Sequence, residues 1–233
     1  MEKLSMIRVF IGFDPRETIA FHVLAHSIQA RASEPVTIAP LMLSQLKSLM
    51  IRERNALQSS DFSFSRFLTP YLCGFEGWAI FMDCDMLVLK DLAELWALRE
   101  DKYAVMCVKH NHVPKEESKF LGAPQTKYEK KNWSSVMMFN CSKCTALSVN
   151  YVNKASGLDL HRFKWLKNDD LIGEIPHSWN QLVGYDEVIP SDQIANLHFT
   201  IGGPYFDEYR NTEYAEEWFR EKQAMLRCDQ LKK

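Results

Sequence analysis

The chain has 233 residues, of which 46% are hydrophobic and 12% aromatic, so it can bury one sizeable core. Its formal net charge is −2, with 28 lysines and arginines against 30 aspartates and glutamates. No run of like charge stands out, which argues against a nucleic-acid-binding stripe and an acidic tail.

Neither a membrane span nor an export signal is evident in the sequence. No apolar stretch is long enough to cross a bilayer, and the first residues lack the apolar core of a signal peptide. We therefore expect a cytoplasmic protein with no transmembrane segment and with reduced thiols. Cys141 and Cys144 form a single C-x-x-C without a second ligand pair, so we interpret them as the start of a helix rather than a zinc or redox site.

Strand patterns flank a helical pattern at the start of the chain. Residues 7–13 and 35–39 are apolar and short, as in strands, and residues 18–31 place apolar side chains at helical spacing. This order predicts a right-handed parallel crossover. At the end of the first strand, Gly12 lets the backbone turn or approach a ligand closely.

A buried arginine is predicted in the next apolar segment. Residues 41–54 are expected to form a helix or helical turn, and residues 64–72 a buried helical segment that carries Arg66. An unpaired buried guanidinium is costly, so Arg66 either pairs with a carboxylate or reaches a phosphate. The segment by itself favours the carboxylate pair.

Two aspartates follow the most apolar strand of the chain. Asp83 and Asp85 come directly after residues 78–82, and residues two apart on an extended chain point the same way. Open α/β sheets bind ligands at the carboxyl ends of their strands. Two close carboxylates repel each other unless a cation lies between them, and Mg²⁺ or Mn²⁺ accepts such oxygens. The alternative is a pair of turn aspartates that each cap the following segment.

The second half of the chain alternates strands with helices. His110 and His112 follow one of these strands, and we interpret them as a polar strand end rather than a metal site. The last helix is amphipathic and is expected to dock on the domain. The predicted elements are a helix at 91–98, strands at 103–109 and 136–140, a helix at 144–154, a strand at 196–200 and a helix at about 211–231.

Five stretches in this order together resemble one family, the GT-A-fold glycosyltransferases. The chain is most similar to their family 8, which includes glycogenin and bacterial galactosyltransferases. The resemblance covers nearly the whole chain. It is carried by Ile11-Gly12-Phe13-Asp14, Ser65-Arg66-Phe67-Leu68-Thr69-Pro70, Phe81-Met82-Asp83-Cys84-Asp85, Asn132-Trp133-Ser134-Ser135-Val136 and His198-Phe199-Thr200-Ile201-Gly202-Gly203.

The resemblance implies a fold and an activity. The fold would be α/β, with a mixed, mostly parallel central sheet flanked by helices in a single domain over residues 1–233. The activity would be that of a metal-dependent glycosyltransferase, similar to hexosyltransferases, with a nucleotide-diphosphate sugar as donor and UDP as its expected nucleotide. A glycan, a lipid-linked compound or a protein would accept the sugar, and no nucleic acid would bind.

The resemblance also implies roles for particular residues. Mn²⁺ or Mg²⁺ would be held by Asp83, Asp85 and His198. Catalytic roles near the reacting sugar would fall to Asp169, Asp170 and Arg66. The nucleotide sugar would contact Gly12, Phe13, Asp14, Arg66, Asp83, Cys84, Lys131, Ser134, Ser135, Gly202 and Gly203.

The chain departs from the family pattern at three places. No lysine precedes Pro204, where the family has a phosphate-binding lysine, so this contact would come from Arg66, Lys131 or backbone amides. Residues 202–204 read as a tight turn that exposes backbone N–H groups, which can receive a phosphate. Ser135 stands where the family often has glycine, and Asp169-Asp170 replaces Asp-Gln, so the stereochemistry of transfer stays open.

Two other functions are compatible with parts of this pattern. A D-x-D phosphatase also ends a strand in two aspartates, but it carries them on its first strand and follows them with small or hydroxyl residues. Here Met86 and Leu87 follow. A nucleotide-binding protein of the same fold without turnover is the second alternative, and the missing lysine is the reason to consider it.

Overall fold

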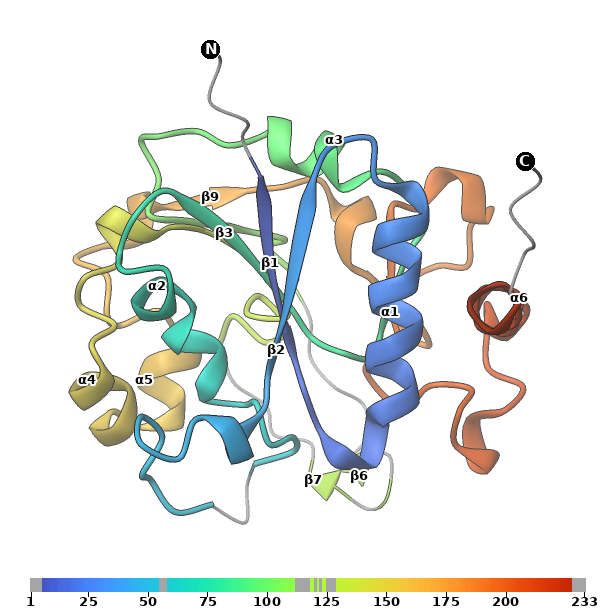
Figure 1. Cartoon of the computed structure of the whole chain (residues 1–233), viewed down its shortest axis with the longest axis horizontal. Helices are drawn as coiled ribbons and strands as arrows, with labels where there is room; N and C mark the ends of the chain where they lie inside the picture. The colour runs from blue at the N-terminus through green and yellow to red at the C-terminus, as the bar shows by residue number, and fades with distance from the viewer. Residues whose placement is uncertain are drawn as a thin grey trace.

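A computed structural model describes residues 6–54, 58–111, 118–119, 121, 123–124 and 129–227, which form a single α/β domain. Figure 1 shows its elements along the chain. The α-helices are α1 (Thr18–Arg31), α2 (Thr69–Leu72), α3 (Leu92–Ala97), α4 (Val149–Lys154), α5 (Gly157–His161) and α6 (Ala215–Leu226). The strands are β1 (Ile7–Gly12), β2 (Val36–Leu41), β3 (Trp78–Met82), β4 (Met86–Val88), β5 (Val105–Cys107), β6 (Ser118–Lys119), β7 (Ala123–Pro124), β8 (Val136–Asn140), β9 (Ile172–Glu174), β10 (Gln181–Leu182) and β11 (Asn196–His198).

The central sheet of the described residues has six strands in the order β2-β1-β3-β8-β5-β9. β1 runs parallel to β2 and β3, and β5 runs parallel to β9. β8 is antiparallel to both of its neighbours, β3 and β5. The predicted mixed, mostly parallel sheet is therefore confirmed, and the carboxyl ends of β1, β3, β5 and β9 lie at the same edge.

A second, small sheet has the order β10-β11-β4. β4 pairs antiparallel with β11, and β10 pairs parallel with β11. The residues after Asp85 form β4, a strand that was not predicted. It reverses direction from β3 and pairs with β11, in the last part of the chain.

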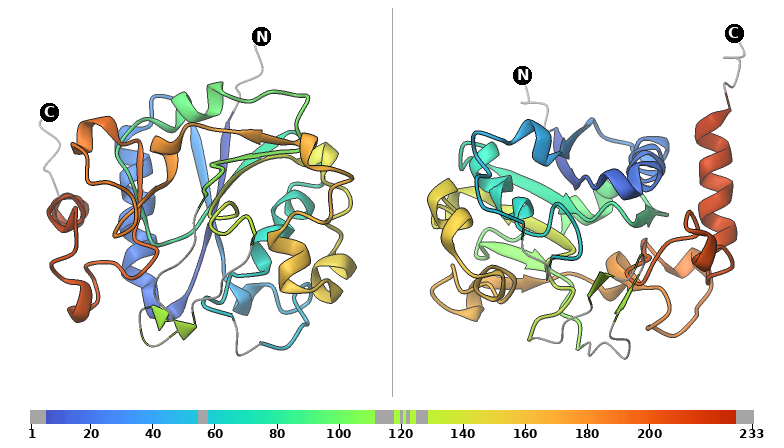
Figure 2. Two further views of the ribbon diagram at one scale, coloured as in Figure 1. Left: turned by 180° about the vertical axis from the view of Figure 1, so that it is seen from behind. Right: turned by 90° about the horizontal axis from the view of Figure 1, so that it is seen from below.

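The helices cover the central sheet from two sides. Figures 1 and 2 show α2, α4 and α5 grouped on the side away from α1 and α6. α6 docks on α1, as predicted: Glu221 is 7% exposed and its two oxygens meet His26 Nδ1 at 2.6 Å and Arg31 Nη2 at 2.8 Å. Trp218, 1% exposed, packs with Val23 and Leu197 in a small core beneath it.

Several predicted boundaries differ from the observed ones for local reasons. Residues 41–54, expected to form a helix or helical turn, contain a short 3₁₀ turn at Leu43–Gln45, which follows the end of β2 at Leu41. The expected helix over 144–154 begins at Val149, where the Ser148 side chain caps it. The last helix begins at Ala215 rather than near 211, because Tyr214 has a left-handed backbone, with φ 57°, that a right-handed helix does not contain.

Three further expectations bear on the surface and on the thiols. Leu226, expected on the apolar side of α6, is 66% exposed. No helix among the described residues is long and apolar enough to cross a bilayer. The cysteines described here, which exclude Cys228, are free thiols, including both members of the C-x-x-C. The cytoplasmic location stays a prediction.

Candidate active site

The two aspartates of the D-x-D stretch lie where β3 ends. Residues 79–82 of β3 are fully buried, and the backbone N–H of Asp83 donates to the carbonyl of Ser135 at 3.0 Å, beside the start of β8. The backbone then turns into β4. The carbonyl of Asp85 accepts a hydrogen bond of 2.8 Å from the N–H of Phe199, which brings the neighbouring His198 beside the aspartates.

Three predicted metal ligands are brought together by this arrangement. One side-chain ligand atom from each of Asp83, Asp85 and His198 lies within 4.8 Å of those of the other two. We call these three residues the acidic centre. Their side chains are shielded, with relative exposures of 13%, 7% and 2%. Electrostatic interactions are strong in such a site, because little water screens them.

The tautomer of His198 follows from its hydrogen-bond chain. The Asn180 amide Nδ2 donates to the carbonyl of Asn132 at 3.3 Å, so its Oδ1 is left as the acceptor that meets His198 Nδ1 at 2.9 Å. His198 therefore carries its proton on Nδ1, and in the neutral ring Nε2 presents a lone pair. Nε2 lies 3.4 Å from Asp85 Oδ1. Proteins usually orient a metal-binding histidine with a hydrogen-bond acceptor at its second ring nitrogen, and the Asn180 oxygen occupies that place here.

The charges of the acidic centre leave room for a cation. Arg66 Nη1 lies 2.7 Å from Asp83 Oδ1 and donates to the carbonyl of Ser134 at 2.8 Å. Arg66 thus pairs with one of the two carboxylates, that of Asp83. Two carboxylates and one imidazole with a free lone pair suit Mn²⁺ or Mg²⁺. The residues present therefore fit a divalent ion at this position.

Two basic side chains, Arg66 and Lys131, lie near His161 beside the start of β8, and we call them the basic wall. His161 is held by a 2.7 Å contact between its Nδ1 and Ser134 Oγ. Burial lowers the pKa of His161 well below its ordinary value, and the positive charges of Arg66 and Lys131 lower it further. His161 is therefore neutral, and the positive charge of this wall comes from Arg66 and Lys131. Ser135, in contrast, turns its Oγ to the carbonyl of Asn132 at 2.9 Å.

The first loop is braced internally at the end of β1. The Gly12 backbone lies against the Phe62 ring so closely that an added Cβ would meet ring carbon at 2.3 Å. Asp14 is 1% exposed; burial alone would raise its pKa, but hydrogen bonds from Arg16 and from the Asp61 N–H outweigh this and hold the pKa below its ordinary value. The Asp14 carboxylate thus anchors its own loop. Phe13 packs edge-on against Phe21 at a centroid distance of 5.5 Å.

Cys84 and the glycine turn are more enclosed than the sequence predicted. Burial and nearby carboxylates raise the pKa of Cys84 well above its ordinary value, so it is a neutral thiol whose Sγ lies toward Glu17. Gly202 and Gly203 are buried rather than exposed, because the rings of Tyr209 and Tyr205 cover the positions of their missing side chains. That their backbone N–H groups receive a phosphate stays a prediction.

Asp169 and Asp170 are not brought to the acidic centre. They lie in a short 3₁₀ turn, Asp169–Leu171, before the amino end of β9, whereas Asp83 follows the carboxyl end of β3. Asp169 is 69% exposed at its side chain, and its Oδ1 pairs with Lys130 Nζ at 2.6 Å. Their role near the reacting sugar stays a prediction.

The structure also adds residues that the sequence analysis missed. Asn180 orients His198, and His161 supports Ser134, through the contacts described above. Glu17 is 1% exposed and accepts a 2.6 Å hydrogen bond from Tyr205 Oη beside the glycine turn. None of these residues stands at a distinctive spacing, so only the hydrogen-bond partner of each one reveals its place.

Solved structures with this architecture are glycosyltransferases. LgtC, a galactosyltransferase solved in complex with donor and acceptor sugar analogs, superimposes with a TM-score of 0.62 at 13% identity, over 96% of this chain and 98% of its own. GlyE of Streptococcus pneumoniae TIGR4 gives 0.62 at 14% identity, over 94% of this chain, and the bifunctional WbbM gives 0.61 at 16% identity, over 96%. This chain spans 60% of GlyE and 53% of WbbM.

The fold is thus the GT-A fold of nucleotide-sugar transferases, and membership of family 8 stays a prediction. No family model matches the chain. One curated protein, Protein CDI of Arabidopsis thaliana, is 49% identical over 221 residues, which are 92% of this chain and 85% of that protein. The chain belongs to the family of Protein CDI.

Proposed function

We propose that the chain is a divalent-metal-dependent glycosyltransferase that moves a sugar from a nucleotide-diphosphate sugar, with UDP as the nucleotide, to a glycan, lipid-linked or protein acceptor. The observation that carries the proposal is the convergence of Asp83, Asp85 and His198, whose ligand atoms lie within 4.8 Å of one another. Two carboxylates and an imidazole held this close suit a divalent cation between them.

In this proposal the three residues of the acidic centre bind the metal ion, and two neighbouring residues position them. Asp83, Asp85 and His198 would hold Mn²⁺ or Mg²⁺, which when bound supplies positive charge to the departing diphosphate, an effect of several kcal/mol. Arg66 fixes the Asp83 carboxylate. Asn180 keeps the His198 ring in one tautomer.

The basic wall supports the nucleotide-sugar part of the proposal. Arg66 and Lys131 lie near His161, at the start of β8, and no lysine precedes Pro204. We propose that Lys131 takes over the phosphate contact of that absent lysine. The Gly202–Gly203 turn is a weaker choice for this contact, because tyrosine rings cover it.

Ligand-dependent thermal stability tests the donor part of the proposal. A ligand that binds only the folded state raises the unfolding midpoint by mass action. We expect UDP with Mn²⁺ to raise the midpoint, while UDP alone and Mn²⁺ alone have smaller effects. Asp85→Asn should abolish the cooperative rise, and His22→Ala, at an exposed position of α1, is the matched control. No rise with any nucleotide in folded protein would contradict the proposal.

Turnover separates the enzyme from a nucleotide-binding protein of the same fold. The wild type incubated with UDP-sugars and Mn²⁺ should release UDP, slowly by hydrolysis and faster once an acceptor is found. Binding of UDP without any release from the UDP-sugars would favour the protein without turnover. Asp170→Asn tests the remaining catalytic prediction: lost release with unchanged UDP binding would support it.

A further inference from the structure

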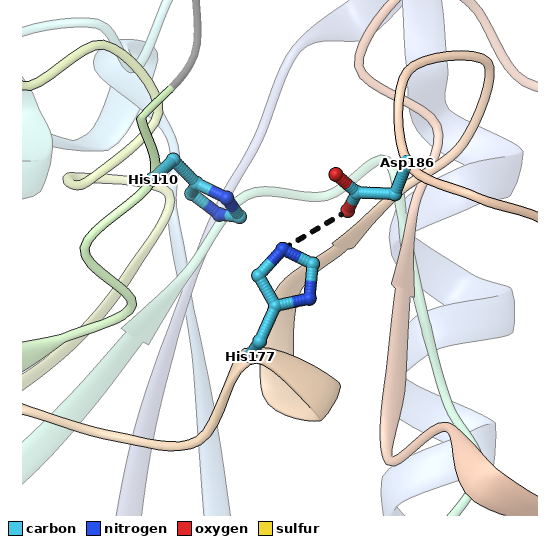
Figure 3. A group of neighbouring side chains, drawn as sticks. All are labelled: His110, His177 and Asp186. Atoms are coloured by element: carbon cyan, nitrogen blue, oxygen red, sulfur yellow. Dashed lines mark ion pairs between the residues drawn. The ribbon is translucent and has the colours of Figure 1, made fainter.

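Three side chains outside the acidic centre also converge. His110, His177 and Asp186 each place one ligand atom within 4.8 Å of those of the other two. We call them the histidine cluster. Figure 3 shows the three side chains pointing toward one another from separate segments of the chain. His110 comes three residues after β5 and His177 three residues after β9, which places both at the carboxyl edge of the sheet.

The spacing of the ligand atoms suits an ion. His177 Nε2 lies 3.3 Å from Asp186 Oδ2. Two ligand atoms bound about 2.0–2.1 Å from a tetrahedral ion lie about 3.4 Å apart. The rings of His110 and His177 meet edge to face, with centroids 5.1 Å apart, so they do not stack and block each other's nitrogens.

The surrounding contacts hold the three residues in place. The N–H of Leu182 donates to Asp186 Oδ2 at 2.6 Å, which fixes the carboxylate. The carbonyl of His110 accepts a 2.8 Å hydrogen bond from Trp133 Nε1. His177 begins the 3₁₀ turn His177–Asn180, which ends with the residue that orients His198. A site built on such anchored segments needs little rearrangement to bind.

The donor atoms select the kind of ion. Two imidazoles and one carboxylate favour borderline ions such as Zn²⁺ over Mg²⁺, which prefers oxygen ligands. His110 is 7% exposed, whereas the side chains of His177 and Asp186 are 52% and 21% exposed, so one side of the cluster is open to water. Three protein ligands and an open position are typical of zinc sites that keep a water molecule.

We propose that His110, His177 and Asp186 form a second divalent-cation site, which takes Zn²⁺ in preference to Mg²⁺ and is separate from the acidic centre. An ion there links the segment after β5 with the segment that carries Asn180. The proposal does not depend on the glycosyltransferase activity, because it concerns other ligands and another class of ion.

Cobalt titration of the untagged, metal-free chain tests the site. Co²⁺ replaces Zn²⁺ and gives visible absorption bands when it is bound with low coordination by nitrogen and oxygen, whereas thiolate ligands would add a charge-transfer band. We use the Asp85→Asn variant as the background, since it weakens the acidic centre. We expect one Co²⁺ per chain without a thiolate band, displaced by Zn²⁺ and not by excess Mg²⁺.

Variants in this background assign the ligands. His177→Ala should weaken Co²⁺ and Zn²⁺ binding roughly tenfold or more, since loss of supporting contacts alone costs about that much. His177 is half exposed, so this variant should keep its metal-free unfolding midpoint. Asp186→Asn keeps an oxygen acceptor for the Leu182 N–H and should weaken binding similarly. His22→Ala should bind as the background does.

Three results would overturn the proposal. They are the absence of Co²⁺ bands at any concentration, a thiolate charge-transfer band in the Co²⁺ spectrum, and unchanged Zn²⁺ affinity in folded His177→Ala and Asp186→Asn. Mn²⁺-dependent UDP binding by the wild type is measured separately. A failure of the second cation site can therefore be told apart from a failure of the proposed function.

Discussion

The acidic centre and the histidine cluster lie at the same edge of the sheet but differ in donors and exposure. The first has two carboxylates and one imidazole, and none of their side chains is more than 13% exposed. The second has two imidazoles and one carboxylate, and its His177 side chain is 52% exposed. One short turn, His177–Asn180, contributes to both. Both groups lie at the same edge of the sheet, so location alone does not decide which ion each of them binds. The donor atoms and the exposure to water decide it.

The largest expected effect comes from the charge balance of the acidic centre. Arg66→Met removes the cation beside Asp83 and leaves its buried carboxylate next to that of Asp85. We expect a loss of about 3–5 kcal/mol in the free energy of unfolding, measured with urea. Added Mn²⁺ should recover part of this loss, whereas Zn²⁺ bound at the histidine cluster should not compensate the charge.

A matched arginine controls for the loss of any ion pair. Arg54 pairs with Asp61 at 2.8 Å, but its side chain is 52% exposed. Arg54→Met should therefore cost less than about 1 kcal/mol. If Arg54→Met and Arg66→Met lowered the free energy of unfolding equally, burial of the Arg66–Asp83 pair would not increase its contribution to stability.

The next effect separates the two groups directly. Asp85→Asn should lower the affinity for UDP with Mn²⁺ by roughly 100-fold or more, because a ligand is lost and not merely its support. The Co²⁺ absorption of the histidine cluster should persist in this variant. Isothermal titration with UDP and optical titration with Co²⁺ measure the two properties. Loss of both in a folded variant would mean that the two groups act as one site.

The shared turn offers a smaller effect. Asn180→Ala removes the acceptor that meets His198 Nδ1 at 2.9 Å. Supporting residues of this kind typically change metal affinity by about 10–100-fold, so Mn²⁺-dependent UDP binding should fall by that factor. Co²⁺ binding by His177 and its partners should change less. A larger effect on Co²⁺ than on Mn²⁺ would reverse our assignment of Asn180 to His198.

The smallest effect concerns a histidine that belongs to neither group. Burial and the charges of Arg66 and Lys131 lower the pKa of His161 in the folded chain. Below about pH 6.5, His161 binds a proton in the unfolded chain but not in the folded chain. The free energy of unfolding therefore falls as the pH is lowered from about 6.5 toward the lowered pKa of His161. This one group changes the free energy of unfolding by at most about 1.4 kcal/mol per pH unit.

Urea unfolding between pH 5 and 7 measures this slope. His161→Gln lacks a titrating ring and should flatten it, although its stability at pH 7 also falls because the contact with Ser134 changes. An unchanged slope in His161→Gln would assign the pH dependence to another group, and His177, whose contact with Asp186 raises its pKa, would be the next to test.

Much of the fold and two of the three residues of the acidic centre could be predicted from the sequence. The apolar run before Asp83 fixes a buried strand, and the spacing of two places both carboxylates together. The assignment of His198 needed the resemblance to a family, because a lone histidine after a short strand has no local signature. Asn180 could not be predicted, since its role depends on β10 and β11 pairing side by side.

The histidine cluster shows where sequence reasoning stops. His110 and His112 were interpreted as a polar strand end, and His112 lies outside the described residues. His177 and Asp186 follow different elements far along the chain, so no spacing links them to His110. Asp169 and Asp170 were suggested by the family resemblance and not by local spacing. The structure places them just before the amino end of β9, and their catalytic role stays a prediction.

The pairing of β4 with β11 has a consequence for biosynthesis. Asp83 and Asp85 leave the ribosome well before Asn196–His198, and among the described strands β4 pairs only with β11. A nascent chain therefore holds two neighbouring carboxylates and an unpaired strand edge until its last part emerges. Contacts this distant in sequence form late in folding. The growing polypeptide consequently cannot complete its three-ligand centre until translation has passed β11.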